Sequence, residues 1–405
     1  MTTLSIVLPT YNRRETLERS LTEGLRLSQH LPVDYIIIDD GSSDSTADYL
    51  TQVAAKDSRV RFQSIENGGP GNARNVGAAM ANGDVLLFVG DDSCPTSTEF
   101  FETHIRIHEQ YREPTLAVLG KMIWPRRKEY PISFVMSMIQ GEGGQQFGYA
   151  HMRPFARYDW RFFYTCNVSI KRSAVNEWSR EGFSSDFRCA AFEDGEFALR
   201  LGKKLGKFDV LYAPTSVAEH DHPYNVEGFL GRQFAAGMMA NVLVKKHPET
   251  AGIVGVSSLV DAMSQPVDLS QEQSQPDQLA VIEGIFASAR LTDRSGQLGS
   301  QAWHTAFIGA AFELAYHKGI IWSYDMEEAN RSAGYTYALE LFDRRMAKVV
   351  EHEQLSTVAP MTYLNNAMLK AEPNWQRVSI GARHKIRSRL ASSKRARSIY
   401  HWLKG

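Results

Sequence analysis

The sequence predicts an α/β fold, in which a mixed but mostly parallel sheet carries helices on both faces, followed by a mainly helical C-terminal region. Short β-rich runs alternate with helical patterns through the first half of the 405 residues. The apolar runs are continuous and do not alternate with polar residues, which is typical of strands buried on both faces of a parallel sheet. After about Asn225 the β-rich runs stop, and helical patterns rich in Ala and Met follow.

The first part contains four predicted strands. They are the β-rich runs at residues 4–9, 34–38, 60–67 and 84–89. A helix is predicted after the first strand, because Leu17, Leu21 and Leu25 recur every four residues and form one apolar face. Asn12 is the predicted N-cap of this helix. Two further helices are predicted, one after residue 45 and one after the glycines at 68–71.

The second half of the sequence is less regular. Residues 121–165 are rich in aromatic residues and arginine, and they are predicted to form loops and short strands over the rim of the sheet. A helix is predicted for 192–206 and a pair of strands for 209–223. The polar Pro/Gln/Ser segment 264–278 is a predicted loop or linker. We therefore expect a domain at residues 1–225 and a helical region at 226–405.

Charge and composition exclude several classes of protein. The net charge of −1 argues against a nucleic-acid-binding protein. Nine positive charges and no acid lie between residues 376 and 405, which leaves −10 on residues 1–375. We expect this basic tail, 377–405, to contact an anionic membrane surface, although a solvated or packed terminal helix explains it equally well.

The three cysteines are isolated from one another, and we see no signal peptide and no apolar run of about 18 residues. We therefore expect a cytoplasmic protein, which could bind peripherally to the inner face of the membrane. The oligomeric state is left open, a homo-oligomer included.

The apolar run 84–89 ends on two adjacent carboxylates, Asp91 and Asp92. Two adjacent carboxylates repel each other and are costly to bury, so we expect a positively charged group beside them. Polar clusters also follow two other strands, at Thr10–Asn12 and Asp39–Asp40, and all three clusters should share the rim where such sheets bind ligands. Hard oxygen ligands suit Mg²⁺ or Mn²⁺. We predict a divalent-cation site here; the alternative is a solvated turn.

Three other motifs have both a functional and a structural interpretation. "NGGPGNARNVG" is a glycine-rich turn that lacks the third glycine and the position of a dinucleotide fingerprint, so a Rossmann oxidoreductase is disfavoured. "FEDGEF" places Glu193 and Asp194 at a helix start, where acids either complement the helix dipole or act as a general base. "EHDHP" offers His220 and His222 as metal ligands or as ordinary exposed histidines.

Taken in order, these motifs resemble the family 2 glycosyltransferases, which are inverting enzymes of the Rossmann-like GT-A fold. The resemblance covers roughly residues 3–240 and is carried by "SIVLPTYNR", "IIIDDGSSDST", "NGGPGNARNVGAAMANGDVLLFVGDDS", "NVSIKRSAV" and "FEDGEFALRLGKKLGKFDVLYAP". It implies that a sugar moves from a nucleotide-sugar donor (UDP-, GDP- or dTDP-sugar) to a hydroxyl of a glycan, a lipid-linked sugar or another polysaccharide precursor. It also implies a divalent cation, Mg²⁺ or Mn²⁺, as cofactor.

The resemblance further implies roles for individual residues. His220 would make a metal or phosphate contact, with His222 as its competitor. The nucleotide part of the donor would contact the turn after the first strand, the end of the second strand and the glycine-rich helix, through Pro9, Thr10, Tyr11, Asn12, Arg13, Asp40, Asn72 and Arg74.

The acids divide into two pairs under the same resemblance. Asp92 would ligate the metal, with Asp91 assisting both the metal and the donor. Asp194 would be the general base that takes the proton of the acceptor hydroxyl, with Glu193 beside it.

One departure from the family pattern concerns the metal motif. The usual Asp-x-Asp corresponds to Gly90-Asp91-Asp92, so the first acid is missing or shifted by one residue. This departure supports an alternative function, a non-catalytic GT-A-like module that binds nucleotide sugar or glycan and acts in assembly. A nucleotidyltransferase is disfavoured, because "PTYNRRE" lacks the glycine-rich loop with a lysine that such enzymes carry after the first strand.

Overall fold

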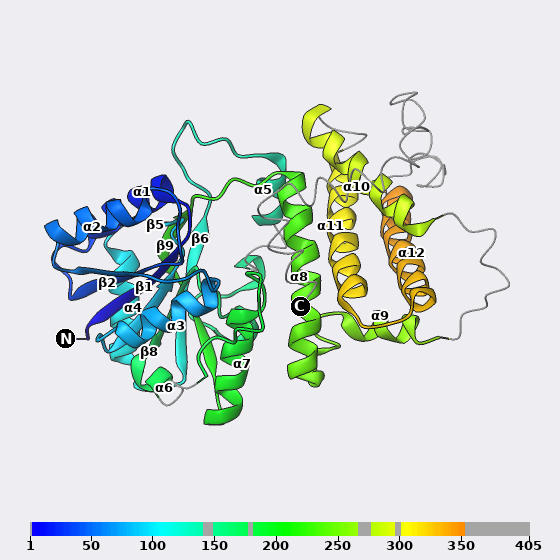
Figure 1. The fold of residues 1–405 in the computed structure, drawn as a ribbon. Coiled ribbons are helices and arrows are strands. Elements are labelled where there is room, and N and C mark those ends of the chain that lie inside the picture. The colour runs from blue at the N-terminus through cyan, green and yellow to red at the C-terminus, as the bar shows by residue number, and fades with distance from the viewer. Residues whose placement is uncertain (1, 141–148, 177–180, 266–276, 296–300, 353–405) are drawn as a thin grey trace.

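The computed structural model describes residues 2–140, 149–176, 181–265, 277–295 and 301–352. Figure 1 shows a layered α/β part and a helical part beside it, with α8 between the two. The predicted fold class is confirmed, because a mixed, mostly parallel sheet with helices on both faces precedes a helical region.

Nine strands of the described residues form one sheet. Their order is β3-β2-β1-β4-β8-β6-β9-β5, with β7 paired to β9 outside this path. The strands β3, β2, β1 and β4 are parallel, as are β6 and β9, whereas β8 lies antiparallel between β4 and β6. The bounds are β1 Leu4–Thr10, β2 Val33–Asp39, β3 Val60–Ser64, β4 Val85–Val89, β5 Ser93–Pro95, β6 Leu116–Ile123, β7 Arg157–Tyr158, β8 Asn167–Lys171 and β9 Asp209–His220.

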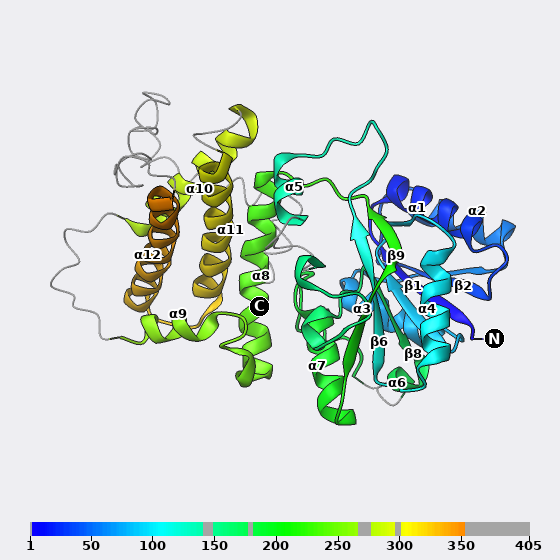
Figure 2. The ribbon, with the colours of Figure 1, turned by 180° about the vertical axis from the view of Figure 1, so that it is seen from behind.

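Helices cover both faces of this sheet (Figures 1 and 2). In β2, Tyr35 and Ile37 pack into the core under α1, α2 and α4, while Ile36 and Ile38 pack into the core under α3, α6 and α7. Burial on both faces explains why the apolar runs are continuous. The helices are α1 Arg14–Leu27, α2 Thr46–Lys56 and α4 Glu99–Gln110 on one face, and α3 Pro70–Met80, α6 Arg172–Asn176 and α7 Glu193–Leu205 on the other.

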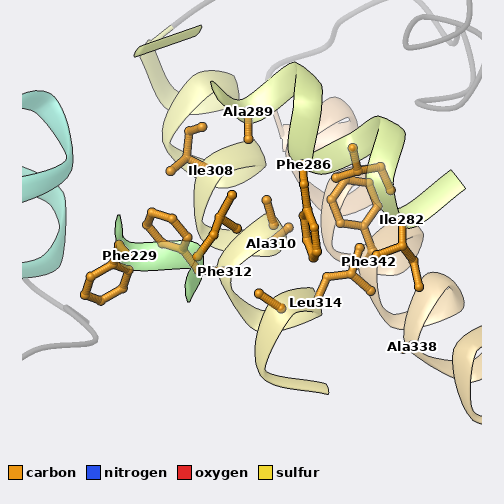
Figure 3. Close-up of a cluster of buried hydrophobic side chains, with 14 of the residues drawn as sticks. Phe229, Ile282, Phe286, Ala289, Ile308, Ala310, Phe312, Leu314, Ala338 and Phe342 are labelled. Atoms are coloured by element: carbon orange, nitrogen blue, oxygen red, sulfur yellow. The ribbon is translucent and has the colours of Figure 1, made fainter. Parts of the chain in front are cut away.

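The helical part has its own apolar core (Figure 3). α11 is largely apolar and lies between α8 and α12, with an exposed Glu313 that pairs with Arg345. Within the described residues, no helix combines the length and the apolar character that a membrane crossing requires. The helices are α5 Phe134–Gln140, α8 Val226–Lys246, α9 Val256–Met263, α10 Gln278–Ser295, α11 Gln301–Ser323 and α12 Glu328–His352, with single 3₁₀ turns at Tyr149–His151, Trp160–Phe162 and Pro248–Thr250.

Two glycines let α8 and α11 cross with their backbones in contact. A Cβ atom added to Gly237 would overlap the carbonyl oxygen of Tyr316, and one added to Gly319 would overlap that of Phe234. Asn241, one turn after Gly237, donates a hydrogen bond of 2.7 Å from its side chain to the carbonyl oxygen of Ile320. The two helices are thus joined by close backbone approach and by a buried polar contact.

The structure differs from the sequence-based expectations at three places. Asn12 is not the N-cap of α1, which begins at Arg14; it has a φ of 51° and its side chain accepts hydrogen bonds from the N–H groups of Ser43 and Asp44. Residues 209–223 contain one strand instead of two: β9, at 209–220, continues past a register shift against β6 and goes on to pair with β5. Residues 121–165 include a helix, α5, in addition to loops.

Other expectations concern the organisation of the chain. α8 begins at Val226, close to the predicted domain boundary after residue 225. However, α5 precedes that boundary and packs Val135, Met136 and Ile139 into the core of the helical part. The boundary therefore stays a prediction. Most of the predicted linker at 264–278 and the whole basic tail 377–405 lie outside the described residues.

We predict that Gly237→Ala lowers the stability of the protein by about 1–3 kcal/mol, because the new methyl group forces α8 and α11 apart. Gly231→Ala on the same helix is the matched control: a Cβ there has open space around it, so this change should be neutral or should add up to about 1 kcal/mol. Thermal unfolding followed by circular dichroism tests the pair. Equal melting temperatures for both variants would contradict the close crossing.

Candidate active site

The strand ends of the sheet bring three of the predicted polar clusters together on one rim. β4 is buried along its whole length and ends at Val89, so the turn that follows delivers Asp91 and Asp92 to the rim. β5 then pairs antiparallel with β9, with Ser93 directly opposite His220. This register places His220 next to Asp92.

The paired carboxylates have the positive neighbour that their burial requires. Arg13, in the turn after β1, donates from Nη1 to Asp91 Oδ1 at 2.9 Å and to Asp92 Oδ2 at 2.8 Å. Thr10, the last residue of β1, donates from its hydroxyl to Asp91 Oδ2 at 2.9 Å. Arg13 therefore contacts the predicted metal-binding acids, although the resemblance placed it in the nucleotide pocket.

Asp92, His220 and His222 form a group whose ligand atoms lie within 4.8 Å of one another. His222 Nδ1 is 3.2 Å and His220 Nε2 is 3.6 Å from Asp92 Oδ2. Both histidines belong to this group. Burial lowers the pKa of His220 to about 4, and the ring is neutral at pH 7. The donor set of one carboxylate and two imidazoles fits a divalent transition-metal ion.

The two acids of the pair differ in their electrostatic surroundings. Burial and the adjacent Asp92 charge raise the pKa of Asp91 to about 7, against the opposing effect of Arg13. Burial also disfavours ionisation of Asp92, but the two imidazoles and the Arg13 guanidinium outweigh it and hold its pKa below the ordinary value. Asp92 is therefore the acid that keeps its negative charge.

Steric contacts explain why a glycine, Gly90, stands at the position of the missing acid. A Cβ atom at residue 90 would lie 2.5 Å from Asp92 Oδ1 and 3.3 Å from Ser93 Oγ. In this conformation of Asp92 there is no room for a side chain at position 90. The departure from the family pattern thus follows from the packing of the turn, and it gives no independent support to a non-catalytic module.

A third carboxylate beside the group, Asp221, has its own arginines. Its backbone N–H donates to the carbonyl oxygen of Asp92 at 2.7 Å. Its carboxylate pairs with Arg127 at 2.9 Å and also with Arg19. Sequence reasoning missed this cluster, although "PRRKEY" supplied a hint of positive charge over the rim.

The residues predicted for the nucleotide lie along the same rim, at the ends of β1 and β2 and the start of α3. Asp40 accepts hydrogen bonds of 2.9 Å from the N–H groups of Gly68 and Gly69, which fixes the turn before α3. A Cβ atom on Gly68 would overlap the Asn72 side chain, so Asn72 lies against the same turn. Pro9 is the penultimate residue of β1, and Tyr11 is exposed after it.

Arg74, also predicted for the donor site, has a buried acid as its partner. Its Nη1 lies 3.1 Å from Glu193 Oε1, with both side chains buried, and its guanidinium also lies over the Phe183 ring. Arg74 therefore links the donor-side helix α3 to the first turn of α7.

Glu193 and Asp194 have different partners in that first turn. Burial and the neighbouring Asp194 charge raise the pKa of Glu193 to about 7. Burial also raises the pKa of Asp194. Asp194 accepts hydrogen bonds from the N–H groups of Gly195, at 2.8 Å, and Thr165, at 3.4 Å. The Asp194 carboxylate is thus oriented by backbone groups, whereas Glu193 is held by a buried cation.

A short segment joins the two acid pairs. Thr165 contacts Asp194 as described, and the carbonyl oxygen of the next residue, Cys166, accepts from Ser93 Oγ at 2.9 Å. Burial, and then the charges of Asp194 and Asp92, raise the pKa of the Cys166 thiol. Asp92 and Asp194 therefore lie on two sides of one site, although 102 positions separate them in the sequence.

The helical part also contacts the first turn of α7. Phe192, the residue before α7, has a φ of 66° and packs against the core of the helical part. A bulky residue in this left-handed conformation is strained and persists only where its surroundings impose it. Glu196 is fully buried and pairs with Arg200 at 2.7 Å and with His247, at the end of α8, at 3.1 Å.

Residues 5–178 match the family model described as glycosyl transferase family 2. This part of the chain is therefore similar to the family 2 glycosyltransferases. The matched segment includes the turn after β1, the start of α3 and the acid pair after β4. It ends before α7, so Glu193 and Asp194 lie outside it.

The chain is also similar to curated glycosyltransferases. It is 26% identical over 240 residues to an uncharacterized glycosyltransferase, EpsJ, of Bacillus subtilis, matching 58% of this chain and 68% of that protein. It is 29% identical over 271 residues to validoxylamine A glucosyltransferase of Streptomyces hygroscopicus, matching 60% and 61%. A third match, 30% over 94 residues, is to the GalNAc(5)-diNAcBac-PP-undecaprenol beta-1,3-glucosyltransferase of Campylobacter jejuni, covering 23% and 30%.

These comparisons confirm the predicted enzyme class, a glycosyltransferase. The chain spans 68% of the length of the first relative, 61% of the second and 30% of the third. The names of these relatives do not transfer their donors or acceptors to this domain.

We predict that Arg74→Met costs about 3–5 kcal/mol near pH 8, because it leaves the buried Glu193 carboxylate without its cation. The pKa of Glu193 lies at about 7 in the folded protein, above its ordinary 4.5. Folding therefore favours the protonated acid, and the stability that this gives is lost as the pH rises through about 7.

At about pH 5.5 Glu193 is protonated, and the loss on removing Arg74 should be much smaller. Urea unfolding of the wild type and the variant at both pH values measures the difference. Glu193→Gln is the control: in that background the pH dependence of the Arg74→Met effect should shrink to the part that comes from Asp194, whose pKa Arg74 also lowers. An equal loss at both pH values would show that the pair is not ionised as described.

Proposed function

We propose that this domain transfers a sugar from a nucleotide-sugar donor to a hydroxyl acceptor with inversion at the anomeric carbon. The observation that supports this most directly is the metal-type group of Asp92, His220 and His222 beside an oriented acid, Asp194. Attack from the face opposite the leaving group needs the diphosphate and the base on opposite sides of the sugar. The segment Thr165–Cys166, which contacts both Asp194 and Ser93, places the two acid pairs next to one another and supports this arrangement.

Asp92, His220 and His222 would hold the divalent cation, with Asp91 close by. When bound, the cation stabilises the charge that develops on the departing diphosphate. Imidazole ligands suit transition metals, whereas Mg²⁺ prefers an all-oxygen set, so we propose Mn²⁺ ahead of Mg²⁺. The three ligand atoms come from two adjacent elements, the turn after β4 and the end of β9, which fixes their spacing.

Asp194 is the proposed general base. Asp194 is half-buried and has no ion-pair partner among the described residues, whereas Glu193 is buried and paired with Arg74. Asp194 would take the proton of the acceptor hydroxyl while the oxygen bonds to the anomeric carbon and the bond to the diphosphate oxygen breaks. Its raised pKa brings it nearer to neutral pH, which favours proton transfer. Glu193 would position this turn through Arg74.

The donor nucleotide would lie along the rim, over the ends of β1 and β2 and the start of α3. Its contacts there are proposed to be Pro9, Thr10, Tyr11, Asn12, Arg13, Asp40 and Asn72, with Arg74 acting indirectly through Glu193. A glycan or a lipid-linked sugar is the proposed acceptor class; the name of the Campylobacter relative, which includes a polyprenyl-diphosphate sugar, supports the second.

Asp92→Asn should abolish the metal-dependent part of nucleotide binding and leave the fold intact, because it removes the charged ligand of the group. Calorimetric titration with UDP and with GDP, each with and without Mn²⁺, measures this. Asp221→Asn is the matched control: this acid is adjacent but pairs with Arg127, so metal-dependent binding should persist. Wild-type binding of nucleotide and Mn²⁺ by the Asp92 variant would place the metal elsewhere.

Asp194→Asn should lower turnover by about 10²- to 10⁴-fold, because the amide keeps the shape of the acid but does not accept the proton. Donor affinity should stay nearly unchanged, since Asp194 faces the acceptor side. Transfer or donor hydrolysis with a screened nucleotide sugar measures turnover. Glu193→Gln should cost less, and the reverse ranking would mean that Glu193 is the base.

A further inference from the structure

Arg13 occupies the position from which a cation would contact the metal group. One of its terminal nitrogens, Nη1, bridges Asp91 and Asp92, at 2.9 and 2.8 Å. The other, Nη2, lies 2.9 Å from His222 Nδ1. The same guanidinium therefore contacts two of the three members of the group.

The chemistry of arginine determines what His222 presents there. A guanidinium has N–H donors and no acceptor, so His222 Nδ1 must carry its lone pair toward Arg13. Asp92 Oδ2 also accepts a hydrogen bond from the same guanidinium. These two atoms are 3.2 Å apart, and adjacent ligands of a small divalent ion, each about 2.1 Å from it, are separated by roughly 3 Å.

We propose that Arg13 is an exchangeable counter-ion: it neutralises the acid pair in the metal-free protein, leaves on metal binding, and then pairs with the diphosphate of the donor. This rests on the proposed metal site. The lone pairs that hold Arg13 are the ones that a metal ion needs, so Arg13 and the metal compete for Asp92 Oδ2 and His222 Nδ1.

Charge balance supports the second half of the exchange. Asp221 is paired with Arg127 and Arg19, so these arginines are engaged with another acid. A divalent ion balances Asp91 and Asp92 by itself, which leaves the positive charge of Arg13 without a partner beside the metal. A diphosphate bound to that metal offers oxygens that match the planar guanidinium fork. The Arg13 side chain is about one-third exposed, so it has space to turn.

The test uses two titrations that should respond in opposite directions. Arg13→Gln should bind Mn²⁺ alone about tenfold more tightly than the wild type, because the competing cation is gone. With Mn²⁺ saturating, the same variant should bind UDP and GDP about tenfold more weakly. Electron paramagnetic resonance of free Mn²⁺ and calorimetry measure the two constants. A merely structural arginine would weaken both.

Arg127→Gln is the matched control, because it removes the same charge next to the group without contacting Asp92. Its Mn²⁺ affinity should stay within about twofold of the wild type. Arg13→Lys keeps the positive charge but loses the planar guanidinium, so its affinities for Mn²⁺ and for nucleotide should lie between those of the wild type and Arg13→Gln. This variant replaces Arg13→Gln in the test if that variant does not fold.

The outcomes separate the exchange from the proposed function. Unchanged or weaker Mn²⁺ binding by both Arg13 variants, with wild-type binding intact, would overturn the exchange and leave the metal site standing. A tighter Mn²⁺ constant without any loss of UDP or GDP affinity would overturn the diphosphate step. Failure of the wild type to bind Mn²⁺, with and without nucleotide, would overturn the metal site and the exchange together.

Discussion

Two adjacent carboxylates at the end of a buried strand are the constraint around which the rest of this protein is arranged. Asp91 and Asp92 are almost fully buried, and burial of like charges is costly unless cations or donors surround them. The surroundings come from two separate strands: Thr10 closes β1, Arg13 lies in the turn after it, and His220 closes β9. The sheet order that places β1 beside β4, and β5 beside β9, makes this convergence possible.

The helical part acts on the active site from the opposite side. α7 begins at the residue pair that includes the proposed base, and its first turn is packed between the sheet and α8. Phe192 is held in a strained conformation by the helical core, and Glu196 is tied to His247 at the end of α8. The helical part therefore supports the orientation of Asp194, and the α/β part without it would lack one wall of this turn.

Sequence reasoning succeeded where a structure depends on a local pattern. The continuous apolar runs predicted β1, β2 and β4, which are buried along almost their whole length. It failed for β9, where Pro214 and its polar neighbours suggest a turn, although the strand continues along β6 through a register shift. It also misplaced the role of Asn12, whose left-handed backbone serves a turn instead of a helix cap.

The site shows the same division. The need for a cation beside Asp91 and Asp92 followed from their adjacency alone. Which arginine supplies it did not, because Arg13 and Arg14 are equivalent in the sequence and only the turn at Asn12 aims the first at the acids and the second at Glu18. The link from Arg74 to Glu193 spans 119 positions, and no local pattern predicts a contact of that kind.

The close approach of Gly90 to Asp92 has a consequence for the routes by which this site can change. An acid at position 90 would have to displace the Asp92 carboxylate, which three neighbouring side chains hold in place. The side chain at position 90 and the position of the Asp92 carboxylate are therefore coupled, and one does not change without the other. An acid at position 90 would require Asp92 to move together with its contacts to Arg13 and the two histidines.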